Sequence, residues 1–182
     1  QTVVNGDNGI GIGNGAVVQM TAPGGIAIGQ NANVGFADAV ALGTNAQANG
    51  IQSLALGAGS LTSFGTNAAL GAGAKATAQA GDVALGANSV TAVVVPTTGI
   101  TIDGTAYTFA GGAPTSTVSV GALNAERTIT NVAAGRISNS STDAVNGSQL
   151  WATTQAIGAV YTQLTTVSSQ LTHYYGVNDG GT

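Results

Sequence analysis

Hydrophobic residues recur along the first part of the chain in short groups, each closed by a glycine. The phrase is a small or apolar residue, then Ala, then Ile or Leu, then Gly. Five copies follow one another, at residues 26–29, 40–43, 54–57, 68–71 and 83–86, and degenerate copies stand at 10–13 and 118–121. The closing glycines of the middle copies lie 14 residues apart. A fixed period of this kind indicates a stack of repeated structural units.

A period of 14 residues is too short for two helices but long enough for two short strands and two turns. One copy cannot bury its own apolar face, so copies must stack about 4.8 Å apart as the rungs of a narrow parallel β-solenoid. We expect the larger residue after each Ala to line the interior, and the Ala to face outward as an association surface. The predicted interior residues are Ile28, Leu42, Leu56, Leu70 and Leu85.

The last interval between repeat glycines is 35 residues long, so one rung carries an insertion at about residues 91–117. Within it, Asp103 and Gly104 separate two alternating runs, and this pair predicts a tight β-hairpin turn. The pairing places four apolar side chains on one face: Ile100, Ile102, Tyr107 and Phe109. Two roles remain open for this hairpin. It caps the open end of the solenoid, or it is a ligand-binding prong.

A different pattern begins near Asp143, where apolar and β-branched residues step by three and four positions. The seam consists of Leu150, Thr153, Ile157, Val160, Leu164, Val167, Leu171 and Tyr174. This a/d pattern predicts a helix of a coiled coil, and Leu at a with β-branched residues at d favours more than two strands. Thr142 or Asp143 is the expected N-cap. Trp151, at position b, is expected to pack beneath the segment that joins solenoid and helix (residues 119–147) in a neighbouring chain.

Counting the heptad backward places Asn146 on a d position. Three such amides around a trimer axis would hold an anion or water and fix the register. The alternative is that Asn146 only ends the turn before the helix. Between solenoid and helix, residues 119–147 form an adaptor, in which Arg127 and Arg136 are expected to pair with Glu126 or Asp143, within or between chains.

Composition excludes several classes of protein. The 182 residues include 29 glycines, no cysteine, and only 3 Lys or Arg against 7 Asp or Glu. Disulfide scaffolds and cysteine zinc sites need thiols, and a nucleic-acid binder needs a basic surface. The 43% hydrophobic content argues against disorder, and no apolar run is long enough to cross a membrane. The first residues carry no signal-peptide pattern. We therefore expect the chain to be a piece of a longer protein.

Candidate catalytic groups are too sparse for a reaction. The single histidine, His173, falls on the solvent-facing c position of the heptad, and Glu126 is the only glutamate. The aspartates are far apart in the chain, so neither a carboxylate pair nor a calcium loop is expected. The sequence therefore predicts no enzyme, no cofactor and no metal.

The Val-Ala-Leu-Gly repeats, the Ser119-Val120-Gly121 phrase and the run at residues 141–150 together resemble the trimeric autotransporter adhesins. The resemblance implies a trimeric left-handed parallel β-roll head of the YadA type at 1–118, interrupted at about 91–117 by a head insert. A neck at 119–147 and the start of a trimeric parallel coiled-coil stalk at 148–182 would follow. It also implies a homotrimer on the bacterial surface, anchored in the outer membrane by a further C-terminal region.

That resemblance implies adhesion to host cells or extracellular matrix proteins, with no nucleic-acid partner and no membrane contact within this part. The alternative is a structural spacer that holds another head. An ice-binding solenoid would need a threonine ladder, which the residues after the repeat glycines do not supply. The candidate ligand-binding residues lie on the outer strand edges: Gln30, Asn31, Thr44, Asn45, Ser60, Asn88 and Ser89.

Overall fold

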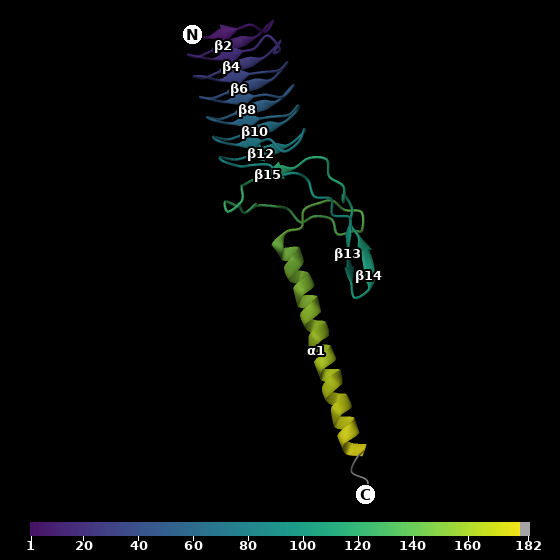
Figure 1. Cartoon of the computed structure of the whole chain (residues 1–182). Coiled ribbons are helices and arrows are strands. Elements are labelled where there is room, and N and C mark those ends of the chain that lie inside the picture. The colour runs from purple at the N-terminus through teal and green to yellow at the C-terminus, as the bar shows by residue number, and fades with distance from the viewer. Residues whose placement is uncertain (179–182) are drawn as a thin grey trace. The chain divides into compact units, whose positions relative to one another are not determined.

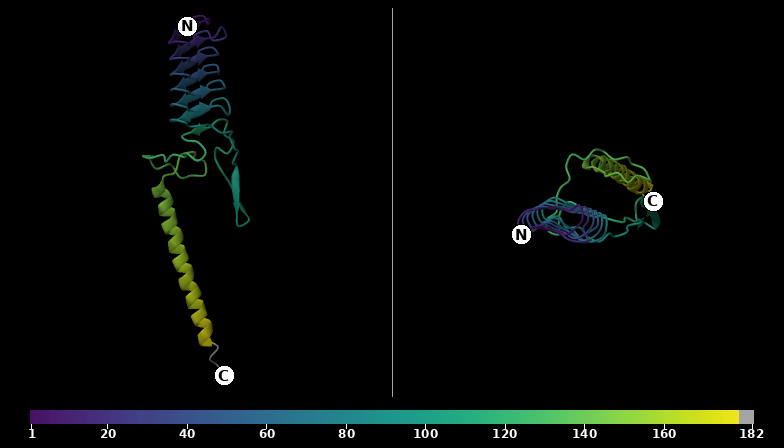
Figure 2. Two further views of the ribbon diagram at one scale, coloured as in Figure 1. Left: turned by 60° about the vertical axis from the view of Figure 1, so that its left-hand side comes forward. Right: turned by 90° about the horizontal axis from the view of Figure 1, so that it is seen from above.

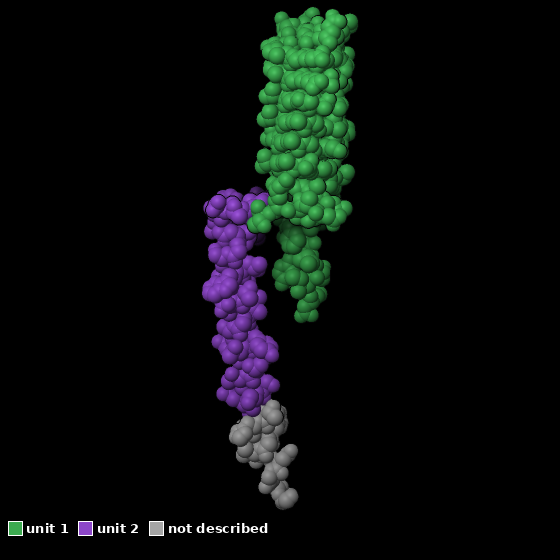
Figure 3. Space-filling model, turned by 90° about the vertical axis from the view of Figure 1, so that its left-hand side faces the viewer, with its two compact units in different colours: residues 1–128 green, residues 129–182 purple. Residues whose placement is uncertain are grey.

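The computed structural model describes the backbone of residues 1–178 and the side chains of residues 1–171. The predictions for the His173 and Tyr174 side chains therefore lie outside the described residues. Residues 1–128 form one compact unit, and the chain from Ile129 onward belongs to a second (Figure 3). In the described part of the chain, the strands lie in the first unit and the second unit contains one helix.

Two parallel sheets build the first unit, and the chain passes from one to the other in each rung (Figures 1 and 2). The first sheet contains β1 (Val3–Val4), β3 (Val17–Val18), β5 (Asn33–Val34), β7 (Gln47–Ala48), β9 (Leu61–Thr62) and β11 (Lys75–Ala76). The second contains β2 (Ile10–Ile12), β4 (Ile26–Ile28), β6 (Val40–Leu42), β8 (Leu54–Leu56), β10 (Ala68–Leu70), β12 (Val83–Leu85) and β15 (Val118–Ser119).

Each strand pairs with the same position of the next repeat. Leu42 lies against Leu56, and Leu56 lies against Leu70. The rung that is one residue longer keeps the register, because Leu70 still pairs with Leu85. The predicted parallel solenoid, with two short strands and two turns in each repeat, is confirmed.

The predicted orientation of the repeat is wrong. The alanines at the centre of the longer strands face the interior, whereas Leu42, Leu56 and Leu85 are 39%, 40% and 48% exposed. The fully buried residues of this column are Ala27, Ala41, Ala55, Ala69 and Ala84. The other two predicted interior residues, Ile28 and Leu70, are half-buried on the same outer side. Alternation fixes which residues share a face but not which face is inside. The interior column of the longer strands is therefore lined by methyl groups.

The opposite sheet contributes the second residue of each short strand to the same interior. Val18, Val34, Ala48, Thr62 and Ala76 are fully buried there. Toward the later rungs the core becomes polar. The Thr62 hydroxyl donates to the Ser53 hydroxyl at 2.8 Å. Every buried side-chain N or O atom among the described residues has a hydrogen-bond partner, as a stable polar core requires.

The glycine that closes each phrase allows the rungs to approach closely. Gly57 has a φ of 130°, and a Cβ there would lie 2.5 Å from the carbonyl carbon of Gly71. Both the left-handed backbone and the contact exclude a side chain. Stacked glycines therefore run along one edge of the roll.

The insertion contains the predicted hairpin. Strands β13 (Gly99–Ile102) and β14 (Thr105–Thr108) are antiparallel, with Ile100 opposite Tyr107. All eight residues of the two strands are exposed. Among the described residues of the first unit, neither strand contacts another strand, so within one chain the hairpin does not cap the roll.

The second unit ends in α1 (Gly147–Asn178), which confirms the predicted helix. Asn146, rather than Thr142 or Asp143, is the N-cap. Its Oδ1 accepts a hydrogen bond from the Gln149 backbone N–H at 3.4 Å, and Gln149 Oε1 accepts one from the Asn146 N–H at 3.2 Å. This reciprocal pair is a capping box. It places the helix start three or four residues later than the sequence suggested.

Candidate adhesive surface

An apolar wall covers the outer side of the longer-strand sheet. We use "apolar wall" for the first and third residues of these strands, which point outward on either side of the buried alanines. Its most exposed members are Ile10, Ile12, Leu42, Leu56, Leu85 and Val118. An apolar surface that continues over this many rungs is unusual for a monomeric soluble protein and marks an interaction site.

The turns that follow the repeat glycines form a polar column along one edge of the roll. Gln30, Asn31, Thr44, Asn45 and Asn88 are exposed there. Asn31 donates to the Asn45 side chain at 3.3 Å, one rung away. Asn31, Asn45 and Asn88 have φ between 56° and 59°, a left-handed conformation that asparagine tolerates well. The structure thus places these five predicted residues on one accessible surface.

Ser60 and Ser89 do not belong to that surface, because both are fully buried. The Ser60 hydroxyl donates to the Gly57 carbonyl at 2.8 Å, and the Ser89 hydroxyl donates to the Leu85 carbonyl at 2.8 Å. They occupy the position that alanine fills in neighbouring rungs, such as Ala46. Their role is to fill the core, so the prediction that they bind ligand is wrong.

The helix presents an apolar face whose described side chains are largely exposed. The predicted seam residues Leu150, Ile157, Val160, Leu164, Val167 and Leu171 are 50–65% exposed. Trp151 is 65% exposed as well. The helix carries no acidic residue in its first turn and no basic residue in its last turn, so helix-dipole interactions with charged side chains add little to its stability.

Asn146 has its amide engaged within its own chain. Besides capping the helix, its Nδ2 donates to the Val132 carbonyl at 3.1 Å, and its Oδ1 accepts from the Ser148 hydroxyl at 2.8 Å. These contacts fit the role of ending the neck turn. The anion at a trimer axis remains a prediction.

The two arginines of the neck, Arg127 and Arg136, have different kinds of hydrogen-bond partner. Arg136 Nε lies 2.7 Å from Asp143 Oδ2, and the guanidinium also donates to Oδ1 at 3.0 Å. This pairing was one of the predicted alternatives and is confirmed. It lowers the pKa of Asp143 and raises that of Arg136. Arg127 instead donates to the Ser89 hydroxyl at 2.8 Å and to the carbonyls of Ala87 and Val120.

A buried carboxylate, missed by the sequence reasoning, holds the root of the insertion. Asp82 is fully buried, and its Oδ1 accepts from the backbone N–H and the hydroxyl of Thr117 at 2.9 and 3.1 Å. Its Oδ2 accepts from the Gln79 N–H at 3.1 Å. Burial alone would raise the pKa of Asp82, but the hydrogen bonds from Thr117, Gln79 and Thr91 outweigh that effect and lower it.

Gln79 extends this cluster to the outgoing leg of the insertion. Its side-chain amide donates to Asp82 Oδ1, and its Oε1 accepts from the Val94 N–H at 3.2 Å. One buried group therefore fixes both ends of the insertion. The signal in the sequence was Asp82 itself, a charged residue where neighbouring repeats carry Ala39, Ser53 or Asn67.

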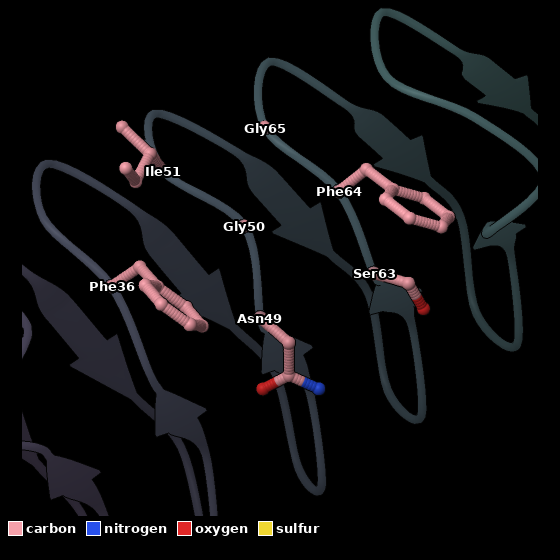
Figure 4. A pocket seen from close by; sticks show the side chains of 7 residues that line it. All are labelled: Phe36, Asn49, Gly50, Ile51, Ser63, Phe64 and Gly65. Atoms are coloured by element: carbon pink, nitrogen blue, oxygen red, sulfur yellow. The ribbon is translucent and has the colours of Figure 1, made fainter.

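A second feature missed by the sequence reasoning is an apolar groove on the other edge of the roll. It is lined by Phe36, Asn49, Gly50, Ile51, Ser63, Phe64 and Gly65 (Figure 4). Two of the three phenylalanines in the chain lie here, 28 residues apart and therefore two repeats apart. That spacing was the available signal, because it places both rings at the same position of the turn.

Among the described residues, no three His, Cys, Asp or Glu side chains gather where they could hold a metal ion. No helix in the described part of the chain has the length and hydropathy to cross a bilayer.

Two family descriptions match the chain. The coiled stalk of trimeric autotransporter adhesins matches residues 128–173, and two copies of the YadA head domain repeat match residues 37–60. The match to the stalk family begins where the second compact unit begins. Head and stalk models therefore fall on the roll and the helix, respectively.

Two curated adhesins resemble the chain in sequence. Autotransporter adhesin BtaE of Brucella suis biovar 1 is 69% identical over 71 residues, which are 39% of this chain and 10% of that protein. Autotransporter adhesin EhaG of Escherichia coli O157:H7 is 35% identical over 153 residues, which are 82% of this chain and 6% of that protein. The chain thus spans a tenth or less of the length of these two relatives.

Two solved structures resemble the chain. The C-terminal YadA-like domain of BPSL2063 from Burkholderia pseudomallei is 41% identical, with a TM-score of 0.51 over 78% of this chain and 52% of that one. The collagen-binding domain of the Yersinia adhesin YadA is 22% identical, with a TM-score of 0.55 over 85% of this chain and 87% of that one. At 22% identity, the similarity to the YadA domain shows a shared fold.

Proposed function

Because this chain belongs to the YadA-like trimeric autotransporter adhesins, we propose that three copies assemble through the apolar wall and present their remaining surface for adhesion to host cells or matrix proteins. The observation that carries the proposal is the outward ladder of large aliphatic side chains over a core made of alanine. In water this ladder would expose Leu42, Leu56 and Leu85 in successive or nearby rungs. Covering them with the walls of further copies removes that cost.

The helix supports the same assembly. A seam of six half-exposed apolar residues on a helix rich in Thr and Ser is weakly helical alone, because β-branched residues and Gly158 lower helix propensity. Burying each seam side chain stabilises by roughly 1.5–3 kcal/mol before entropy is counted. Roll and helix each need the same kind of partner, and one homotrimer supplies both.

Adhesion is then a property of the surfaces that the wall leaves open. The polar column at Gln30, Asn31, Thr44, Asn45 and Asn88 carries no charge and is interrupted at Ala58 and Ala72, so each contact would be weak. Three identical copies multiply weak contacts by raising the effective concentration of the remaining sites. The relatives BtaE and EhaG are named adhesins, and the YadA domain of the same fold is named for collagen binding. These names favour a surface-exposed protein, anchored in the outer membrane, that binds a host protein.

A spacer is the second candidate function. The chain spans 10% and 6% of the two curated relatives, so another segment of the full protein would have room for a separate binding head. In that case, the roll and stalk would only set the distance of that head from the bacterial surface.

The test is direct binding of the purified 182-residue chain to cultured epithelial cells and to immobilised collagen, fibronectin and laminin. Saturable binding to one of these, competed by unlabelled chain, supports the adhesin. A correctly assembled trimer that binds none of them would favour the spacer.

A further inference from the structure

We propose that the groove between Phe36 and Phe64 is a docking site for an extended, uncharged peptide segment of the host protein, with one bulky apolar side chain seated between the two rings. The inference rests on the proposed adhesin function and names a site for it, on the edge of the roll opposite to the polar column.

The groove owes its shape to three successive rungs that carry different residues at the same turn position. Phe36 and Phe64 lie two rungs apart, which corresponds to roughly 10 Å between equivalent positions. Gly50 occupies the rung between them and has no side chain that could fill the space between the rings; a Cβ there would lie 1.9 Å from the Phe64 carbonyl oxygen, so the position accepts only glycine. Figure 4 shows Gly50 between the two rings, with Ile51 beyond it. The space measures about 260 Å³, which suits one or two side chains rather than a large ligand.

The groove lies away from the wall that the other copies need. Its lining includes Asn49 and Ser63, which directly follow the short strands β7 and β9, and none of the outward residues of the longer strands. In Figure 4 the side chains of Asn49, Ser63 and both phenylalanines extend to the same side. An interface between copies requires on the order of 800 Å² from each partner, more than seven small or partly covered residues supply. The groove by itself therefore does not form an interface with a second copy.

The residues that line the groove favour a neutral, apolar peptide segment as its occupant. No charged side chain lines the groove, so a charged ligand group would lose its hydration without gaining a partner. Phe36 and Phe64 are both 44% exposed, and aromatic residues that flank a slot are typical anchors of a protein interface. The side chains of Asn49 and Ser63, one rung apart, offer neutral donors and acceptors to a peptide backbone. At about 3.3 Å per residue, an extended segment of about three residues spans the roughly 10 Å between the two phenylalanine positions.

The first experiment uses a defined probe. Saturation-transfer NMR compares acetyl-Gly-Phe-Gly-amide with acetyl-Gly-Asp-Gly-amide in the presence of the full chain. The variants are Phe36→Ser/Phe64→Ser and the matched control Met20→Ser, which removes an exposed apolar side chain from the same column of turns without touching the groove. We expect a signal for the phenylalanine peptide only, about a tenfold loss in the double variant, and no change in the control. Unchanged mass and circular dichroism confirm that each variant is assembled.

The second experiment measures adhesion of the same proteins to cells and to immobilised matrix proteins. The expected result is about a tenfold weaker binding for the double variant than for the unaltered chain and Met20→Ser. If the double variant adheres as well as the unaltered chain, the groove is not the docking site, although the adhesin function stands. If the unaltered chain adheres to nothing, the adhesin function fails, and the peptide probe alone decides on the groove. Competition by a methyl galactoside instead of the peptide would overturn the inference in favour of a carbohydrate site.

Discussion

Asp82 Oδ1 accepts a hydrogen bond of 2.9 Å from the backbone N–H of Thr117, 35 residues further along the chain. The insertion begins and ends within that interval. A carboxylate inside the roll therefore decides where the chain leaves the solenoid and where it returns. A solenoid can tolerate a long excursion of this kind when the two ends are fixed in neighbouring positions of one rung.

The first prediction concerns this buried carboxylate. Replacing Asp82 by Asn puts an amide N–H₂ where an acceptor faces several donors, so we expect a loss of about 2 kcal/mol in the stability of the last rungs. Amide exchange at Val94 and Thr117 should become faster, because the two ends of the insertion open more often. Thr117→Val removes only the hydroxyl donor, keeps the backbone N–H, and should have a smaller effect.

The pH dependence of the same site gives a second prediction. Because the pKa of Asp82 is lower in the folded chain than its ordinary value, its contribution is fully present above the unfolded pKa and is lost as pH falls through the folded one. Amide exchange at Thr117 should therefore report a local opening that becomes more favourable below about pH 4. The Asp82→Asn variant should lack this component. An equal acid dependence in both proteins would contradict the assignment.

Core packing gives a third prediction. Ala55 is fully buried between the two sheets, so Ala55→Leu should force the sheets apart and cost about 1–3 kcal/mol or more. Leu56→Ala, at the adjacent outward position, leaves the inside of the roll unchanged and should weaken assembly instead. Urea unfolding at several protein concentrations separates the two effects. If Leu56→Ala destabilised the roll independently of concentration and Ala55→Leu were neutral, the observed orientation would be wrong.

Arg127 gives a fourth prediction. In the inner rungs the carbonyl of Ala72 accepts the Asn88 N–H at 2.8 Å. At the last rung, the equivalent carbonyl is that of Ala87, and it accepts a hydrogen bond from the Arg127 guanidinium instead. The same guanidinium also donates to the Val120 carbonyl. Arg127→Gln should cost about 1 kcal/mol and increase amide exchange in the last rung. Arg127→Lys should restore little, because one ammonium group cannot reproduce the planar fork of donors.

The repeat, the insertion and the helix could be predicted because each depends on local pattern. The spacing of the glycines fixed the number of residues in a rung, and Asp103-Gly104 fixed the hairpin pairing that the structure has. The face of the strands could not be predicted in the same way, since Ala55 and Leu56 alternate whichever of them is inside. Which residue faces inward depends on how the two strands of a rung pack together, and the alternation within one strand does not show that packing.

The candidate site shows the same limit. The predicted residues that are exposed lie at the tips of the turns, where side chains extend into solvent. They are Gln30, Asn31, Thr44, Asn45 and Asn88. Ser60 and Ser89 looked alike in sequence, but they occupy a position that faces inward in every rung. The Phe36–Phe64 groove was missed because its parts come from three different rungs, and the residue that creates the space is Gly50, which has no side chain.

A wall variant gives the fifth prediction. Leu42→Lys/Leu56→Lys places two charges on the outer face of the longer-strand sheet, where they would be buried without partners in a trimer. We expect this variant to dissociate while the single roll keeps its alanine core. Thr44→Lys and Asn45→Lys, on the exposed polar column, should leave the assembly intact and serve as the matched control.

We infer that the chain needs two further copies to cover its apolar wall and helix seam. Sedimentation equilibrium of the unaltered 182-residue chain measures this directly. With a chain mass of 17.4 kDa, we expect a single species of about 52 kDa at micromolar concentration. A stable, folded species of 17.4 kDa under the same conditions would contradict it.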